Sequence, residues 1–292
     1  MPPKSKHLLT ALLLELLRLA VLALVLDRLH CWRERQHHRR ASLVAKMSSR
    51  VKSVALEAVE ALRQRGWLAD GTLREANLAE ACLKGAALDG ADLQRASLVQ
   101  TNLAGAMLAW ADLRGASLAE ANLHEASLLQ ANLAGADLTE ADLRGAVLRG
   151  ANLQGARLRY ANLRGACLAC ADLRRARAEV SYLREADLHQ ADLRGADLHQ
   201  ADLKAASLRG AQLQGANLRN AELAGADLSE AAFDESTTLP DGGAWTPNSD
   251  LARFTDPAHP EFWRYEEPAD WAGAIVERQR QRLFLRYQGD HA

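Results

Sequence analysis

Few side chains in this 292-residue sequence have the types and spacing that catalysis or metal binding requires. Cys167 and Cys170 form one Cys-x-x-Cys pair, but no second pair and no histidine lies near it in the sequence to complete a zinc site. His37 and His38 lie among charged residues, which favours a solvated pair. No nucleophile lies beside a base, and the glycines form no phosphate-binding loop. We therefore predict no catalytic residue, no cofactor, no metal ligand and no enzyme activity.

The overall charge excludes a simple class of nucleic-acid-binding protein. The chain has 36 basic and 37 acidic residues, and four cysteines do not make a disulfide framework. The charge is unevenly spread, because residues 1–70 carry a net charge of +7, residues 71–235 of −5 and residues 236–292 of −3. This asymmetry indicates parts of the chain with different surroundings, and we expect no direct contact with nucleic acid.

The element that must position these side chains is a five-residue repeat that fills residues 71–235. The unit is Ala-(Asp/Asn/Ser)-Leu-x-x, with leucine at the third position in 31 of 33 units and alanine at the first in 30. On an α-helix, a period of five would spread the leucines around the axis and leave no apolar face. A short extended segment followed by a turn instead points the alanine and leucine of each unit to one side. The pattern predicts a solenoid with alanine and leucine inside and the other three positions outside.

This segment resembles the pentapeptide repeat family over 165 of the 292 residues. The resemblance implies an all-β solenoid, a right-handed quadrilateral β-helix with four units in each coil and about eight coils, flanked here by α-helices. Residues twenty apart would then stack on one face. His189 and His199 are half a coil apart, so we expect them on opposite faces, where they could not share a metal ion.

The N-terminal residues 1–32 contain an apolar run from Leu8 to Leu26 that is interrupted by Glu15 and Arg18. The run is long enough for a helix that nearly crosses the hydrocarbon core of a bilayer, and we predict a single membrane span. The alternative is a leucine-rich helix that oligomerises or is buried in a partner. The positive-inside rule would place the repeat in the cytoplasm, on the inner membrane of a bacterium, with arginines beside lipid headgroups. These membrane-flanking arginines are Arg28, Arg33, Arg35, Arg39 and Arg40.

Two further segments flank the repeat. Residues 33–70 include apolar positions at helical spacing from Leu43 to Leu62, which predict one amphipathic helix that ends at Gly66 and caps the first coil. Residues 236–292 are rich in aromatic side chains and predict a C-terminal cap with a terminal helix over residues 269–287. The segments Thr238 to Gly242 and Arg253 to Pro257 are similar to the tails of membrane-tethered bacterial members of the family.

Stacking at a period of twenty predicts a basic stripe along one corner of the solenoid. Such a stripe could hold phosphate or an acidic partner, whereas the alternative is a solvated face whose charges are paired locally. The basic stripe consists of His124, Arg144, Arg164, Arg184 and Lys204.

The same stacking gathers apolar side chains at outward positions of another face, where a solvated surface needs none. We predict that this apolar patch contacts a protein partner or a second copy of the chain, and the alternative is cover by the N-terminal helix or the C-terminal tail. The apolar patch consists of Met107, Trp110, Leu129, Val147 and Cys167.

These features favour a non-enzymatic scaffold, tethered to a membrane, that presents surfaces to protein partners of unknown identity. The resemblance implies one alternative function, since some family members mimic the size and charge of DNA, bind DNA gyrase and protect it from inhibitors. Such mimicry needs a dominant negative field, and the repeat carries 17 basic residues among its 22 acidic ones. Dimers also occur in the family, which leaves a homo-oligomer open.

Overall fold

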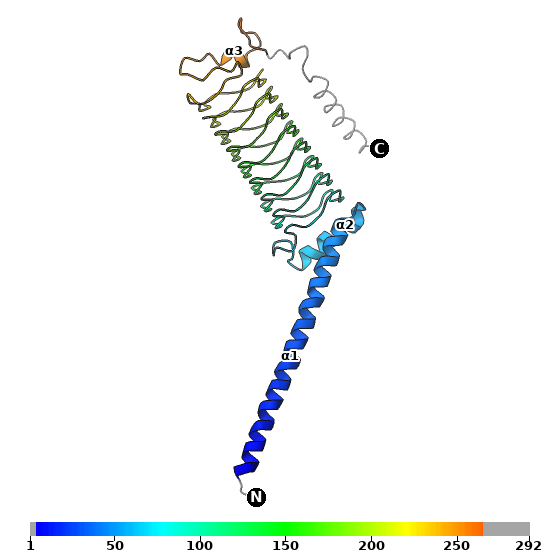
Figure 1. The fold of residues 1–292 in the computed structure, drawn as a ribbon. Coiled ribbons are helices and arrows are strands. Elements are labelled where there is room, and N and C mark those ends of the chain that lie inside the picture. Colours follow the sequence, from blue (N-terminus) through cyan, green and yellow to red (C-terminus); the bar gives the residue numbers. More distant parts are fainter. Residues whose placement is uncertain (1–3, 265–292) are drawn as a thin grey trace, which may run out of the picture.

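The computed structural model describes residues 4–264, of which residues 4–17, 19 and 20 are described by their backbone alone. Helix α1 (Lys4–Met47) projects away from one end of a solenoid, and the short helix α2 (Lys52–Gln64) lies beside the C-terminal part of α1 at that end (Figure 1). Helix α3 (Ala252–Thr255) lies at the opposite end of the solenoid (Figure 1). The repeat therefore separates two unlike caps.

The solenoid advances by one coil every twenty residues. Parallel backbone bridges join residues twenty apart in four columns, for example Met107 to Ser127 to Val147. Each bridge is an isolated residue pair, because a turn follows after every five residues and no longer strand can form. Four units therefore make one coil.

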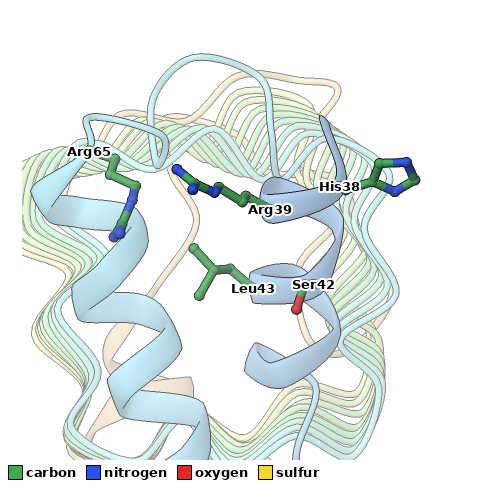
Figure 2. A pocket seen from close by; sticks show the side chains of 5 residues that line it. All are labelled: His38, Arg39, Ser42, Leu43 and Arg65. Atoms are coloured by element: carbon green, nitrogen blue, oxygen red, sulfur yellow. The ribbon is translucent and has the colours of Figure 1, made fainter. Parts of the chain in front are cut away.

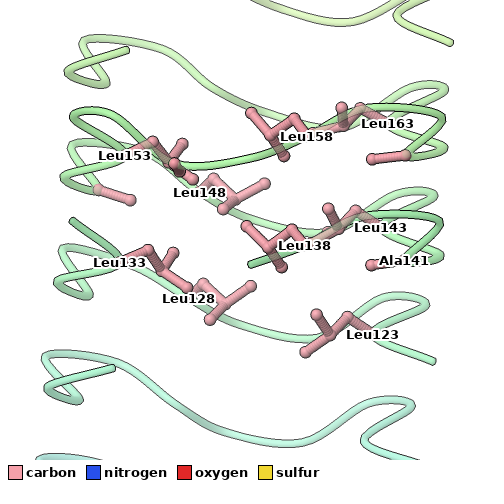
Figure 3. Packing of buried hydrophobic residues seen from close by; sticks show 14 of the residues in the cluster. Leu123, Leu128, Leu133, Leu138, Ala141, Leu143, Leu148, Leu153, Leu158 and Leu163 are labelled. Atoms are coloured by element: carbon pink, nitrogen blue, oxygen red, sulfur yellow. The ribbon is translucent and has the colours of Figure 1, made fainter. Parts of the chain in front are cut away.

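The core consists of stacked leucine and alanine columns. Every leucine at the third position from Leu73 to Leu223 is almost fully buried, and so is every first-position alanine from Ala81 to Ala221. Figure 3 shows Leu148 directly above Leu128, and Leu158 directly above Leu138. A buried leucine contributes about 1.5–3 kcal/mol before conformational entropy is subtracted, so each coil of four leucines is held by its own apolar core.

The corners are tight turns in which the last residue of each unit has a positive φ. In one such turn the N–H of Ala131 donates to the carbonyl of Leu128 at 3.0 Å, and Gln130 has φ 54°. Positive φ at the third residue of the turn is the signature of a type II turn, which favours glycine there. The frequent glycines at the fifth position are explained by this backbone conformation.

The N-terminal cap is joined to the first coils by backbone hydrogen bonds. The N–H of Cys82 donates to the carbonyl of Ser49 at 2.9 Å, and that of Asp92 donates to the carbonyl of Leu68 at 2.8 Å. Met47, Leu62 and their apolar neighbours are buried with the solenoid core. These segments cover the end of the solenoid that would otherwise expose unpaired backbone groups.

The amphipathic helix predicted from Leu43 to Leu62 differs from the structure, which has two helices there. The chain turns at Ser48 and Ser49, whose side chains bond the carbonyl of Ala45 and the N–H of Val51. Serine side chains compete in this way with the helical backbone. Gly66 ends α2 as predicted, with φ 68° and a hydrogen bond to the carbonyl of Arg63.

The predicted single-pass inner-membrane location is wrong. Within the described residues, no helix combines the length and the apolar character that crossing a bilayer requires. Two charges, Glu15 and Arg18, interrupt the apolar run, and α1 continues without a break into the charged segment after Leu26. Contact of the flanking arginines with lipid stays a prediction. The alternative, a helix that packs against a partner, stays a prediction.

The C-terminal cap continues the solenoid with an irregular hairpin. Thr238 bridges Asn217 in the coil before and Ala244 in the returning strand. Phe233 stacks on Trp245 with ring centroids 5.8 Å apart, and Phe254 meets Trp263 edge to face at 6.1 Å. These aromatic residues thus close the last coil. The terminal helix predicted over residues 269–287 lies outside the described residues.

Candidate protein-interaction surface

The second position of each unit has a structural preference that explains its aspartates and asparagines. The side-chain oxygen there accepts the N–H of the residue two positions later, as Asn102 does from Ala104 at 3.1 Å and Asn132 from Ala134 at 3.2 Å. This local hydrogen bond satisfies a backbone donor at the corner. A residue that cannot accept it therefore lacks a contact that favours the turn.

One face lacks this residue type in five successive coils. Its second positions are occupied by Ala87, Met107, Ser127, Val147 and Cys167, and aspartate returns on the same face only at Asp187. Where Met107 cannot accept the N–H of Ala109, the Asp89 carboxylate of the preceding coil accepts it instead at 3.2 Å. In these five coils of the described solenoid, the hydrogen bond from the second-position side chain to the backbone is therefore absent on this face, and apolar side chains occupy several of its positions.

The structure brings the predicted apolar patch together and leaves it uncovered by the described residues. Met107 is 45% exposed, Trp110 61% and Val147 40%, and no other large apolar side chain of the described repeat is comparably exposed. Leu129 and Cys167 are half-buried beside them. Trp110 donates its indole N–H to Gln130 at 2.6 Å, which fixes the ring on the surface. The alternative of cover by the N-terminal helix does not hold for the described residues.

The predicted basic stripe also forms, but its charges are paired. Arg144 makes two hydrogen bonds to the Asp142 carboxylate, at 2.8 and 2.7 Å, and Arg164 meets Glu185 at 3.2 Å. Arg184 lies 3.7 Å from Asp202, Lys204 pairs with Glu222, and His124 bonds the carbonyl of Arg144 at 2.9 Å. The stripe consequently matches the paired alternative better than a free phosphate site.

Similar pairs neutralise the face next to the apolar patch. Hydrogen bonds from Arg114, Arg174 and Arg194 hold the pKa values of the carboxyl groups of Asp112, Asp172 and Asp192 below their ordinary range. In each pair the aspartate occupies the second position and the arginine the fourth position of one unit. Such pairs weaken the negative electrostatic field that mimicry of DNA by this chain would need.

The structure also groups side chains that sequence spacing left apart. His189 lies in the coil after Cys167 and Cys170, with its Nδ1 atom 2.7 Å from Asp187, and Asp187 accepts a weak hydrogen bond from the Cys167 thiol at 3.8 Å. Burial raises the pKa of the Asp187 carboxyl, but the hydrogen bonds from His189 outweigh it and leave the pKa lowered. The signal for this cluster was the period of twenty, which stacks position 189 on position 169. Within the described residues, no group of three or more histidine, cysteine, aspartate or glutamate side chains is placed to hold a metal ion.

Two pockets lie at the caps. The first, of about 370 Å³, lies between α1 and α2, where Arg39 extends toward α2 above Leu43, Arg65 runs back along α2 to the carbonyl of Ala61, and His38 points away (Figure 2). The second, of about 390 Å³, lies between the last coils and the C-terminal cap and is lined by Phe254, Phe262 and Trp263. The first is an open groove, because Leu43 alone among its five lining residues is partly buried.

The arginines predicted to flank a membrane divide into two groups. Arg28, Arg33, Arg35 and Arg39 are exposed on α1. Arg40 instead belongs to the cap, where it pairs with Asp70 at 2.9 Å and lies 4.8 Å from the ring centroid of Trp67. Its charge therefore stabilises the junction between α1 and the first coil.

Comparison with protein families agrees with this geometry. The family model described as pentapeptide repeats matches in eight copies that together span residues 72–237, more than half of the chain. The chain belongs to the pentapeptide repeat family. Its solenoid is accordingly a right-handed β-helix, and members of this family are generally structural or binding proteins without enzyme activity.

Solved structures of other family members are similar to this pentapeptide repeat protein. HetL, involved in heterocyst differentiation regulation in the cyanobacterium Nostoc sp. strain PCC 7120, is 36% identical, with a TM-score of 0.33 over 59% of this chain and 82% of HetL. A trypsin-treated variant of QnrB1, a plasmid-mediated fluoroquinolone resistance protein, is 22% identical, with a TM-score of 0.37 over 52% of this chain and 79% of that one. A search of the curated proteins found no match to this pentapeptide repeat protein.

Proposed function

We propose that this protein is a non-enzymatic scaffold whose rigid solenoid presents the apolar patch to a protein partner. The observation that carries the proposal is the run of five successive coils in which one face gives up its aspartate or asparagine. Stability alone favours the polar residue at each of these positions, because its side chain bonds the backbone at the corner. Apolar residues concentrated there against that preference indicate selection for contact with another surface.

The geometry suits a docking surface rather than a ligand site. Met107 and Val147 lie two coils apart on one flat face, about 10 Å from each other at the usual spacing of neighbouring strands. Both side chains are exposed, and Trp110 extends the patch to the adjoining corner. Aromatic and methionine side chains are enriched at the centres of protein interfaces, where they supply most of the binding free energy.

Site-specific photo-crosslinking in cells that produce the full chain tests the proposal. A photoreactive amino acid replaces Ser127, in the centre of the apolar patch, or Asn132, the matched second position on the neighbouring face. We expect crosslinked protein from position 127, with this chain or with another, and its loss when Met107→Asp and Val147→Asp are added. Equal crosslinking from both positions, or none from position 127, would contradict an interaction at the patch.

A further inference from the structure

Large and small side chains alternate along the apolar face. Its second positions in four successive coils are Ala87, Met107, Ser127 and Val147. Consider a second copy related by a two-fold axis that lies in the plane of contact, at right angles to the solenoid axis, between the coils of Met107 and Ser127. This axis would set the two apolar faces against one another with the order of the coils reversed. Met107 would then lie opposite Ser127, and Val147 opposite Ala87, so that each large side chain meets a small one.

The adjoining corner also complements itself about this axis. Its fourth positions in these coils are Asp89, Ala109, Leu129 and Arg149. The same axis would place Leu129 opposite Ala109, and Asp89 opposite Arg149. In the described part of one chain the Asp89 carboxylate accepts the N–H of Ala109, and neither Asp89 nor Arg149 has an ion-pair partner. The two residues lie three coils apart in one chain, so they could form an ion pair only between two copies.

We propose that the apolar patch binds a second copy of this chain, with the two solenoids antiparallel about this axis. This dimer rests on the proposed function, with a second copy of the chain as the protein partner. A two-fold contact uses one surface twice, which requires that surface to complement itself, as these two columns do. A parallel pair would instead set Met107 against Met107 and bring Arg149 toward Arg144 of the other copy. Four coils cover only about 19 Å along the axis, so the dimer is expected to have a micromolar Kd.

Analytical ultracentrifugation of the full chain over a dilution series tests this arrangement by charge reversal. We expect the native chain to dimerise, Met107→Asp to abolish the dimer, and Arg149→Asp to raise the Kd at least tenfold. The double variant Asp89→Arg with Arg149→Asp should return the Kd to within about threefold of the native value, because the reversed charges again face one another. Arg209→Asp, on the same corner but three coils beyond Arg149, is the matched control and should leave the Kd unchanged. Circular dichroism checks the fold of each variant.

Three results would overturn the inference. The first is a native chain that stays monomeric at about 100 micromolar, well above the expected Kd. The second is a dimer that persists in Met107→Asp. The third is a double variant whose Kd is as high as that of Arg149→Asp alone. A monomeric purified chain that still crosslinks another protein from position 127 in cells would leave the proposed function standing and remove only the second copy. A monomeric chain that also gives no crosslinked protein from position 127 would contradict both proposals.

Discussion

The basic stripe and the apolar patch are both columns of outward side chains stacked at a period of twenty, yet the chain treats them differently. Each arginine of the stripe has a carboxylate within reach, either in its own unit, as Asp142 for Arg144, or in the next coil, as Glu185 for Arg164. Among the described residues no side chain covers the apolar patch, and Met107, Trp110 and Val147 stay exposed. The charges of the basic stripe are thus paired within the described chain, whereas the side chains of the apolar patch stay in contact with water.

The difference follows from the geometry of the repeat. Second and fourth positions of one unit point outward side by side, so an aspartate and an arginine placed there form a pair without help from another molecule. Apolar side chains on a flat outer face cannot remove one another from water to the same extent. A charged column in this fold is thus weak evidence for a binding site, whereas an apolar column is strong evidence.

The largest effect is expected where a stripe pair is buried. The Asp142 carboxylate is 0% exposed beneath Arg144. Arg144→Met keeps the aliphatic cover but removes the partner of a buried charge, which should lower the free energy of unfolding by about 3 kcal/mol. Arg164→Met breaks a pair that is exposed on both sides and should cost only about 0–1 kcal/mol. Urea denaturation measures both, and equal losses would show that the stripe does not act by local pairing.

Trp110 offers the reverse test on the apolar patch. Its φ of 55° is a conformation that suits glycine, and the same corner column has glycine at Gly90 and Gly150. Trp110→Gly should therefore stabilise the isolated chain by about 1 kcal/mol, less whatever the lost hydrogen bond to Gln130 contributes. The same change should weaken binding at the patch. A clear loss of stability in urea would mean that the ring supports the fold rather than an interaction.

Much of the fold could be predicted from the sequence because the repeat constrains every residue in the same way. Thirty-one leucines at one position permit only a structure in which that position is always inside. The family resemblance implies four units in each coil, and the backbone bridges have the same period of twenty, which gathers Met107, Trp110 and Val147. The caps at both ends were predictable for a related reason, as the pattern stops abruptly at each.

Other features depend on interactions that a linear pattern does not carry. The break between α1 and α2 arises at Ser49, whose carbonyl bonds Cys82 in the first coil, a contact between segments that spacing does not connect. The pairing of Arg164 with Glu185 depends on side-chain conformation across two coils. The leucines of the N-terminal run favour a membrane span, whereas Glu15 and Arg18 oppose it, and these opposing contributions are so nearly equal that composition does not decide between them. His189 and Cys167 become neighbours only where coils stack, which adjacent sequence does not show.

Acid should weaken the paired columns more than the apolar patch. The folded pKa values of Asp172 and Asp192 are lower than in the unfolded chain, so their pairs stabilise the fold above about pH 4 and lose that contribution as the pH falls through the folded pKa values. Tm should fall as the pH is lowered from about 5 to 2. The variant Asp172→Asn with Asp192→Asn should show a shallower fall, and Met107→Ser with Val147→Ser should keep the native slope. Identical slopes in all three proteins would contradict the stabilising role of these pairs.

The smallest effect is expected from the apolar patch itself. Met107→Ser with Val147→Ser removes two exposed side chains that no buried residue depends on, so the monomer should change in unfolding free energy by no more than about 0.5 kcal/mol. Leu108→Ala, one residue away but inside the core, should cost about 2–5 kcal/mol. Urea denaturation at concentrations well below the expected Kd measures the monomer alone. A loss near that of Leu108→Ala would show that the patch holds the coils together, and the contrast with the basic stripe would then lose its functional meaning. An unchanged monomer would leave contact with another surface as the reason for these side chains.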